Sequence, residues 1–322
     1  MDLFCCILME IRMKKLSVGS LGAFELELPV IEVSSGIPGP RIVFIANQHG
    51  NEMTPLFVLK ELLAMLEKNP LKKGRVAIVT TANPLGLLFD SRQEPVDGDN
   101  LNRSFPGSMQ KGLGARIAAA VFGEAREADL VVDLHTFSRQ CPFLGILVKT
   151  GDEVQEKCRS ALRVIAPECV WQIDMERDAD KNFSGALDLA LVQDGIPAIA
   201  LEMERHLTIS SEKLSRIARS LLRLIVSYDM TDARVGDVPQ KEIPVFISHY
   251  LYTEGSGIFT PSKSVFDEVR KGDVLGLVAD IRTFAEEPVL APFSGILLTI
   301  RFRDFVRTGT RLASIGEQKG VL

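Results

Sequence analysis

The chain has 322 residues, of which 46% are hydrophobic and 25% are charged. This length exceeds the usual size of one compact core and the composition is that of a soluble globular protein, so we expect one large domain and a smaller one. The formal net charge is −5 and the basic residues are spread along the chain, which excludes nucleic acid as an expected partner.

The N-terminal residues and the cysteines bear on the cellular compartment. In residues 1–15 an apolar run is broken by Glu10, and the basic residues follow it rather than precede it. This order predicts a first strand, or a leader from an upstream start codon, rather than a targeting signal or a membrane span. The five cysteines show no C-x-x-C spacing, which favours reduced thiols in the cytoplasm over disulfides or a cysteine-type zinc site.

The first part of the chain has the pattern of an α/β unit. Loose alternation over residues 15–33 predicts a leading antiparallel edge. Residues 41–46 and 75–82 are apolar and predict two buried strands, and residues 55–68 carry leucines at helical spacing between them. Strand, helix and strand in this order form the parallel crossover unit, which predicts an α/β domain.

A long polar segment follows. Residues 83–107 show no apolar period, and a polar loop of this length inside a compact domain usually has a function. Residues 168–183 are mixed and predict no regular element. Elsewhere, apolar spacing predicts a helix at 111–125, strands at 128–134 and 143–148, helices at 153–165 and 187–193, a strand at 198–204 and a helix at 210–228.

The pattern changes near residue 236. Beyond it, short apolar runs are separated by glycines, which is typical of an all-β segment. We therefore expect a large domain over residues 1–235 and a small β domain over residues 236–322. The second segment contains an internal repeat, because residues 257–272 and 295–309 each begin with Gly-Ile, continue to Val-Arg and end in glycine. The repeat predicts two similar β half-units packed together.

Four side chains that can bind a metal or transfer a proton lie at the ends of predicted strands, where open α/β sheets place their ligand sites. His49 and Glu52 follow the strand at 41–46, His135 follows the strand at 128–134, and Glu202 lies near the end of a later strand. Two histidines and a carboxylate leave one coordination position of Zn²⁺ open for water, so we interpret His49, Glu52 and His135 as ligands of one zinc ion. Glu202 is then the candidate base for that water.

These assignments have simpler alternatives. A His-x-x-Glu spacing often arises by chance and can be a satisfied polar turn, so it needs support from its context. Glu204 lies on the same face of the strand as Glu202 and is a rival base. In the polar loop, Arg92, Asn102 and Arg103 can hold a substrate carboxylate and a developing oxyanion, although loop arginines often contact only solvent.

The ordered motifs supply that context. Residues 48–52 (QHGNE), 83–86 (NPLG), 99–107 (DNLNRSFPG), 133–135 (DLH) and 197–202 (PAIALE) resemble, in this order, the succinylglutamate desuccinylase/aspartoacylase family, a branch of the zinc carboxypeptidase-like hydrolases. The resemblance runs from about residue 41 to residue 205. It implies an α/β fold with a zinc-carboxypeptidase-like mixed sheet flanked by helices. The glycine-rich tail is similar to the small all-β domain that often follows, and resembles a biotinyl/lipoyl-type barrel-sandwich.

The resemblance also implies roles for individual residues. His49, Glu52 and His135 correspond to the zinc ligands and Glu202 to the general base. Asn102 and Arg103 correspond to the substrate-holding pair, and Arg92 to the arginine nearer the scissile carbonyl.

The chain departs from the family pattern in two places. Asn100 stands where the family usually has aspartate, and Glu204 stands where it usually has glycine, which leaves the substrate open. A tyrosine sometimes reaches the site in relatives, and Tyr250 or Tyr252 could do so here. The tail has no lysine between Lys271 and Lys319, so it cannot carry biotin or lipoate at the expected hairpin tip. It is better explained as a cover, a homo-oligomer contact or a wall of the site entrance.

We therefore predict a zinc-dependent hydrolase that cleaves a carbon–nitrogen bond other than a peptide bond, in a small carboxylate-bearing substrate such as an N-acyl amino acid. Three alternatives stay open from the sequence: a metallocarboxypeptidase acting on peptides, a non-catalytic metal- or ligand-binding protein, and a hydrolase for an ester instead of an amide. We expect a cytoplasmic protein with no membrane partner.

Overall fold

The computed structural model describes residues 9–237 and 241–322. The start of the expected first strand or leader, including Cys5 and Cys6, lies outside the described residues. From residue 10 the chain is in strand β1, so the strand alternative holds for this part. Among the described residues, no helix combines the length and hydropathy that a membrane crossing requires.

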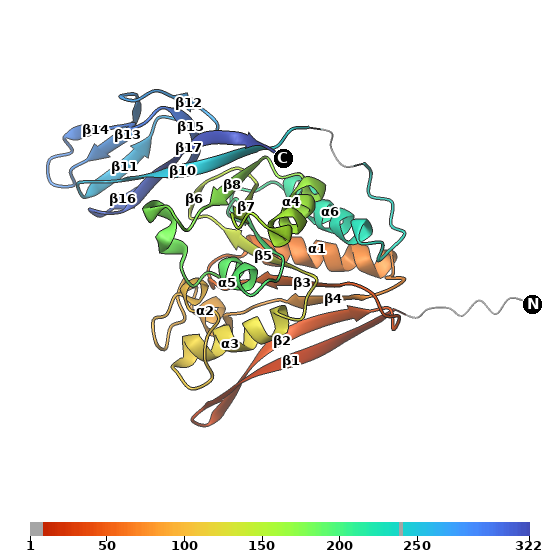
Figure 1. Ribbon diagram of the computed structural model, residues 1–322. Coiled ribbons are helices and arrows are strands. Elements are labelled where there is room, and N and C mark those ends of the chain that lie inside the picture. Colours follow the sequence, from red (N-terminus) through yellow and green to blue (C-terminus); the bar gives the residue numbers. More distant parts are fainter. Residues whose placement is uncertain (1–8, 238–240) are drawn as a thin grey trace, which may run out of the picture.

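One mixed sheet organises the molecule (Figure 1). Within the described residues it has 13 strands, in the order β1-β2-β4-β3-β5-β9-β7-β8-β10-β17-β15-β12, with β6 pairing to β15 beside this path. The strands are β1 (Glu10–Leu21), β2 (Phe24–Ser34), β3 (Arg41–Ala46), β4 (Arg75–Val79), β5 (Leu130–Thr136), β6 (Arg139–Gln140), β7 (Leu144–Val148), β8 (Cys169–Ile173), β9 (Ala198–Met203), β10 (Pro244–Tyr252), β12 (Glu268–Val269), β15 (Gly295–Arg301) and β17 (Arg311–Val321).

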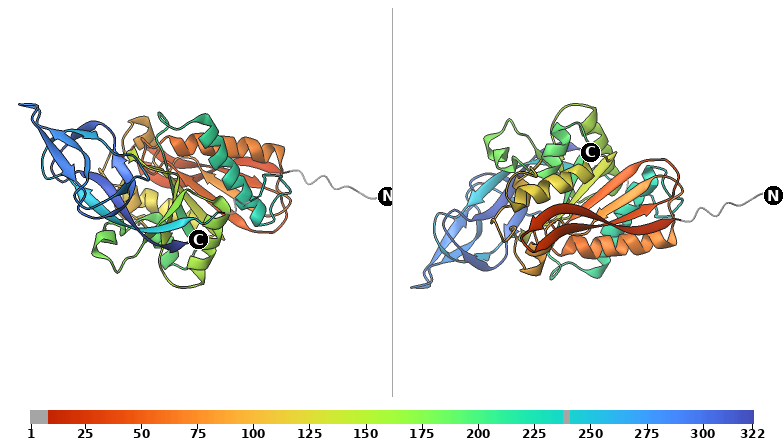
Figure 2. Two further views of the ribbon diagram at one scale, coloured as in Figure 1. Left: turned by 90° about the horizontal axis from the view of Figure 1, so that it is seen from above. Right: turned by 90° about the horizontal axis from the view of Figure 1, so that it is seen from below.

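Helices cover the sheet on both sides (Figure 2). Helix α1 contacts α6, α6 contacts α4, and α3 contacts α5. β3, β5 and β9 are buried along their whole length, as expected for parallel strands that are covered on both faces. The helices are α1 (Thr54–Lys68), α2 (Pro84–Leu88), α3 (Leu113–Ala125), α4 (Glu153–Ile165), α5 (Leu187–Gln193) and α6 (Ser211–Ser227), with short 3₁₀ turns η1 (Leu101–Arg103) and η2 (Asp178–Phe183).

The order of the parallel strands fixes the place of the site. β3 pairs in parallel with β4 on one side and with β5 on the other. The connection from β3 through α1 to β4 therefore runs in the opposite direction to the connection from β4 through α3 to β5. Right-handed crossovers that run in opposite directions put their helices on opposite faces of the sheet. They leave a crevice beyond the carboxyl ends of β3 and β5, which is where such sheets bind ligands.

Most predicted elements are present within one or two residues. The strand at 41–46 and the helices at 153–165 and 187–193 have the predicted bounds. The strand expected at 75–82 is shorter and ends at Val79. The elements that were missed are short: β8 and η2 lie in the segment without a predicted element, α2 and η1 lie inside the polar loop, and β6 has only two residues.

The C-terminal segment continues the main sheet and adds a second one. β10 pairs in parallel with β8, so the sheet runs on past the boundary expected at residue 236, and the division into two domains stays a prediction. The second sheet has the order β14-β13-β11-β16, with β11 (Gly257–Pro261), β13 (Val274–Ala279), β14 (Glu286–Leu290) and β16 (Asp304–Val306). The two repeat copies exchange partners, because β11 pairs with β16 and β12 pairs with β15.

Candidate active site

The turn after β3 is held rigidly, and it carries His49 and Glu52. Asn47, in the left-handed region at φ 58°, donates from Nδ2 to the carbonyls of His49 and Gly50, both at 3.1 Å. Gly50 packs so closely on α2 that a Cβ atom there would lie 1.9 Å from the carbonyl carbon of Gly86. Only glycine permits this approach. The polar loop thus supports the turn.

Helix α1 begins at Thr54, a residue type that commonly caps helices. Thr54 does not cap the helix, because its hydroxyl donates to the carbonyl of Glu204 at 2.7 Å and the residue before the helix, Met53, makes no side-chain cap. The bond instead ties the start of α1 to the chain just beyond β9. The contact with Glu204 uses the hydroxyl that would otherwise be available to cap the helix.

Three buried side chains converge at the crevice. His49, Glu52 and His135 offer ligand atoms that all lie within 4.8 Å of one another. His49 Nδ1 is 2.9 Å from Glu52 Oε1, and His135 Nδ1 is 3.0 Å from Glu52 Oε2. The backbone N–H of Thr136 also donates to Glu52 Oε2 at 2.9 Å, which orients the carboxylate.

The far nitrogen of each imidazole has its own acceptor. His49 Nε2 lies 2.9 Å from Asn100 Oδ1, and His135 Nε2 lies 2.9 Å from Asp133 Oδ2. Gln48 Nε2 donates to the same Asp133 oxygen at 2.7 Å. Acceptors at Nε2 place the proton there and leave the Nδ1 lone pairs directed at Glu52, which is how metal-binding histidines are usually oriented.

The charges of this cluster fit a bound cation. The two histidines lower the pKa of Glu52 well below its usual value in spite of burial. Burial opposes charge on His135 as well, but Asp133 and Glu52 raise the pKa of that imidazole well above its ordinary range. His49 Nδ1 is buried and makes no hydrogen bond to any described residue. Two imidazole nitrogens and a carboxylate gathered within 4.8 Å are a donor set that suits one metal ion.

Glu202 stands next to the cluster. In the parallel pairing of β5 and β9, His135 is directly opposite Glu202. Burial raises the pKa of Glu202 to about 8, and its Oε2 has no hydrogen-bond partner among the described residues. The rival Glu204 instead pairs with the ammonium of Lys213. Only Glu202 of these two carboxylates lines the cavity with His49 and His135.

The three residues predicted from the polar loop also reach this cavity. Arg92 Nη1 donates to Glu52 Oε1 at 2.6 Å while half of its side chain is exposed. Asn102 accepts the N–H of Leu187 at 3.0 Å, and its Nδ2 lies 3.2 Å from His135 Nε2. The guanidinium of Arg103 lies 5.2 Å from the centre of the Phe183 ring. The structure brings all seven sequence-predicted residues together, because six of them line this cavity and Glu52 contacts His49, His135 and Arg92, whereas their separate roles stay predictions.

The cavity is small. Its volume is about 60 Å³, and its walls are mixed polar and apolar, with lining residues His49, Arg92, Asn102, Arg103, His135, Phe137, Ile146, Val148, Ile173, Phe183, Ala186, Asp188, Leu189, Ala200, Glu202 and Arg311. Neither tyrosine considered from the sequence lines it. The Tyr250 hydroxyl donates to Asp180 at 3.0 Å, and Tyr252 lines a different cavity.

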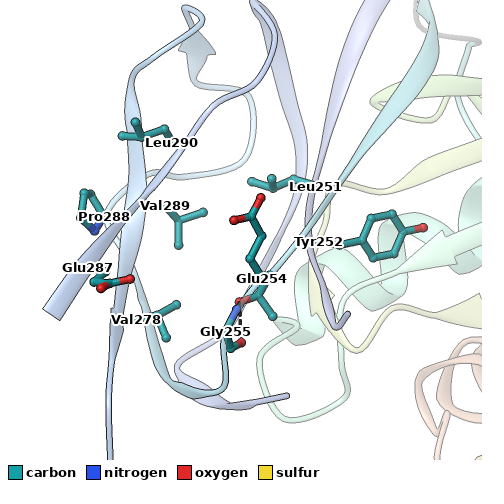
Figure 3. Close-up of a pocket in the computed structure, with 10 residues that line it drawn as sticks. Leu251, Tyr252, Glu254, Gly255, Val278, Glu287, Pro288, Val289 and Leu290 are labelled. Carbon is teal, nitrogen blue, oxygen red and sulfur yellow. Dashed lines mark hydrogen bonds between the residues drawn. The ribbon is translucent and has the colours of Figure 1, made fainter. Parts of the chain in front are cut away.

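That other cavity lies within the C-terminal strands (Figure 3). It has a volume of about 340 Å³ and is lined by apolar side chains such as Val278 and Val289, together with Glu254 and Glu287. None of the residues that line it is a histidine or cysteine, and of the residues considered for the site only Tyr252 lies there. Size alone therefore does not make it the reaction site.

Sequence reasoning missed several residues at the catalytic crevice. Asn100 was noted only as a departure from the family pattern, yet it orients His49. Asp188 and Arg311 line the cavity, and burial raises the pKa of Asp188 to about 6. No motif surrounds Asp188 or Arg311, so no signal in one sequence could have identified them.

The chain is similar to known proteins over most of its length. Residues 38–228 match the family model described as the succinylglutamate desuccinylase/aspartoacylase catalytic domain. The chain is 28% identical over 300 residues to the N-alpha-acetyl-L-2,4-diaminobutyric acid deacetylase of Halomonas elongata, which covers 90% of this chain and 85% of that protein. It is 24% identical over 213 residues to the succinylglutamate desuccinylase of Pseudomonas aeruginosa, covering 62% of each.

Solved structures share the fold. A product-bound ectoine utilization protein EutE from Ruegeria pomeroyi superposes with a TM-score of 0.82 at 21% identity, covering 95% of both chains. An aspartoacylase family protein from Mesorhizobium loti gives a TM-score of 0.80 at 24% identity, covering 96% of this chain and 95% of that one. At these identities the likeness establishes the fold alone.

Proposed function

Because the chain belongs to the succinylglutamate desuccinylase/aspartoacylase family, we propose that it is a zinc-dependent deacylase that hydrolyses the amide bond of a small N-acyl amino acid. One observation carries the proposal. The Nδ1 atoms of two histidines face the two oxygens of Glu52 at 2.9 and 3.0 Å, with Glu202 next to them on the neighbouring strand. This is the donor set of a catalytic zinc site with three protein ligands.

Each residue has a definite task in the proposed reaction. A bound Zn²⁺ supplies Lewis-acid activation of water and of the amide carbonyl. Glu202 takes the proton of the attacking water and returns it to the leaving amine, and its raised pKa suits both steps. Arg92, held against Glu52, directs its guanidinium charge toward the developing oxyanion.

The cavity supports a small, anionic substrate. Arg103 and Asn102 are proposed to hold the substrate carboxylate through charge-assisted hydrogen bonds. The relative from Halomonas is named for an N-acetylated diamino acid and the relative from Pseudomonas for succinylglutamate, so both names describe N-acyl amino acid hydrolases.

Replacement of Glu202 tests the proposal. We expect Glu202→Gln to lower kcat by roughly 10²- to 10⁴-fold, the usual contribution of a general base, while the zinc content per chain stays the same. Glu204→Gln is the matched control, because Glu204 lies two residues away and pairs with Lys213 at the surface of the crevice. If Glu202→Gln kept full turnover, the base would have to be another group.

The alternatives are separated by a substrate panel on the zinc-loaded protein. Turnover of short peptides in preference to acyl amino acids would identify a carboxypeptidase, and turnover of esters alone would identify an esterase. Stoichiometric zinc without hydrolysis of any amide or ester would identify a binding protein.

The remaining proposals concern the C-terminal segment and the cellular compartment. We propose that residues 236–322 form a small domain of the biotinyl/lipoyl barrel-sandwich type, supported by the partner exchange between its two half-units. A role of this segment in a homo-oligomer can be tested by light scattering. A reducing, cytoplasmic setting is supported by Cys141, Cys158 and Cys169, which are buried and free.

A further inference from the structure

Another cavity, on helix α6, has mainly cations among its charged lining residues. Helix α6 contacts α4 (Figure 1), and a cavity of about 310 Å³ lies where α6 meets the end of α4. We call it the α6 cavity. Its charged lining residues are four bases and one acid, namely Arg216, Arg219, Arg223, Lys241 and Glu168. The chain as a whole has a formal net charge of −5, so this positive charge is a local feature.

The three arginines form a row on α6. Positions 216, 219 and 223 are three and four residues apart, which places their side chains on the same face of the helix. At a rise of ~1.5 Å per residue, the row extends about 10 Å along the helix axis. The cavity also has apolar walls, because Ile165 and Ile217 line it and are each 1% exposed. A row of this length can contact two anionic groups of one small molecule, while the apolar walls pack against its carbon atoms.

The one carboxylate does not neutralise this row. Glu168 Oε2 accepts the N–H of Phe143 at 2.6 Å and lies 3.2 Å from the ammonium of Lys213. Its other oxygen lies 3.8 Å from Arg216, which is a distant ion pair without a hydrogen bond. Glu168 can therefore offset the charge of one arginine at most.

The end of α4 accounts for one further cation. Arg223 donates from Nε to the carbonyl of Val164 at 2.9 Å and from Nη2 to that of Ile165 at 3.3 Å. These bonds complete the last turn of α4, where a cation is favourable. The carbonyls carry no net charge, and burial lowers the pKa of Arg223 because water is excluded without a carboxylate to replace it.

The other two cations have unused hydrogen-bonding capacity. Arg219 and Lys241 line the cavity, and their side chains form no hydrogen bond or ion pair with the residues that the structure describes. An arginine side chain offers five N–H donors and a lysine three. Guanidinium groups bind phosphate and carboxylate groups through two parallel hydrogen bonds. An anionic ligand would use these donors and supply the missing negative charge.

We propose that the α6 cavity binds a small organic molecule with two or more anionic groups, either phosphates or carboxylates, at a site separate from the catalytic crevice. No residue lines both this cavity and the one that contains His49, His135 and Glu202. The site therefore does not depend on the proposed function. Its occupant joins the end of α4 to α6.

Two probes test the site and distinguish the anionic groups. Fructose 1,6-bisphosphate carries two phosphates, fructose 6-phosphate carries one, and benzene-1,3,5-tricarboxylate carries only carboxylates. Calorimetry with the zinc-loaded full chain should show one bound molecule of the preferred polyanion per chain. If that polyanion is the bisphosphate, we expect the Kd of the monophosphate to be about tenfold higher or more, because it loses a charge-assisted contact. Absence of binding by both polyanions at millimolar concentration would refute the site.

Single substitutions locate the bound probe. We expect Arg219→Gln to raise the Kd of the preferred polyanion about tenfold or more, with little change in the melting temperature of the free protein because Arg219 is exposed. Arg163→Gln is the matched control. Arg163 is also an exposed helical arginine, it forms no side-chain hydrogen bond or ion pair with a described residue, and it does not line the α6 cavity. Equal effects of the two substitutions would indicate a general effect of charge and would refute the site.

A third variant tests whether the probe enters the catalytic crevice instead. Arg103 lines that crevice, so Arg103→Gln should leave the Kd of the polyanion unchanged. A raised Kd in Arg103→Gln with a wild-type Kd in Arg219→Gln would place the probe in the crevice and overturn the assignment to α6.

Thermal unfolding gives a second readout. A ligand that binds only the folded state stabilises it by mass action, so the melting temperature of the wild-type protein should rise with the concentration of the polyanion. It should rise less in Arg219→Gln at the same concentration. Binding to a protein that hydrolyses nothing would sustain this site and reject the deacylase, and hydrolysis without polyanion binding would do the reverse.

Discussion

Asn100 offers the sharpest test of how the metal cluster is organised. Its Oδ1 lies 2.9 Å from His49 Nε2, and the same oxygen accepts the N–H of Asn102 at 3.2 Å. The substitution Asn100→Ala removes the acceptor that keeps the His49 proton on Nε2. The imidazole can then carry its proton on Nδ1, the atom that faces Glu52.

The size of the effect follows from these two contacts. Loss of an orienting partner of a metal-binding histidine usually costs 10- to 100-fold in metal affinity, so we expect the zinc Kd to rise by about that factor. The lost cap of η1 adds about 0.5–2 kcal/mol of destabilisation, with or without metal. Asn100→Asp restores an acceptor, and its negative charge should bring zinc affinity back to the wild-type level or above.

Competition with a chelator of known affinity measures the zinc Kd. Thermal unfolding of the metal-free proteins measures the contribution of the Asn100 cap to stability alone. The expected pattern is a modest stability loss in metal-free Asn100→Ala and a further loss in its zinc-loaded form. Wild-type zinc affinity in Asn100→Ala would show that Asn100 does not orient His49. Weak binding in Asn100→Asp as well would show that the amide group itself is needed.

Other predictions concern the frame around the site. Gly50→Ala should destabilise the protein by about 1–3 kcal/mol or more and weaken zinc binding, because the new Cβ would meet the backbone of Gly86 at 1.9 Å. The Cβ atom added by Gly123→Ala in α3 would have no heavy atom within 4 Å, so this variant should stabilise the protein by about 0.5–1 kcal/mol. Equal urea midpoints for Gly50→Ala and Gly123→Ala would contradict the argument. Leu62→Ala, at a position with 0% exposure, should cost about 2–5 kcal/mol in urea unfolding, against less than about 0.5 kcal/mol for Leu88→Ala at 73% exposure. Zinc at a hundred times its Kd should add about 2.7 kcal/mol to the stability of the stripped protein, and a melting temperature that did not respond to zinc would exclude a folded-state site.

The sequence pattern predicted the bounds of an element correctly where the element is long or is buried on both faces. Helix α4 has the predicted bounds because its apolar positions recur at helical spacing and Asp152 caps it by accepting the N–H of Gln155. Strand β3 has the predicted bounds because residues 42–46 form an unbroken apolar run after Arg41. Helix α2 was missed because five residues are too few to show a helical period, and strand β8 was missed because Gln172 and the polar residues around it leave no long apolar run.

A contact between distant segments determines how the start of α1 is held. Thr54 has the chemistry of a helix cap, but its hydroxyl is used by the carbonyl of Glu204, 150 residues later in the chain. A tertiary partner outcompeted the local one, which no pattern along the sequence records.

The sequence by itself determined the α/β class, the order of the strands that end at candidate site residues, and the three side chains that converge, His49, Glu52 and His135. It could do so because hydrophobic periodicity and ordered motifs are local properties. Only the tertiary structure decided which atoms orient those ligands and which charges surround the substrate. Asn100 contacts His49, and Arg311 lines the cavity, because strand pairing and loop packing bring distant segments together. The energies of such contacts depend on distance in space, and separation along the chain does not encode that distance.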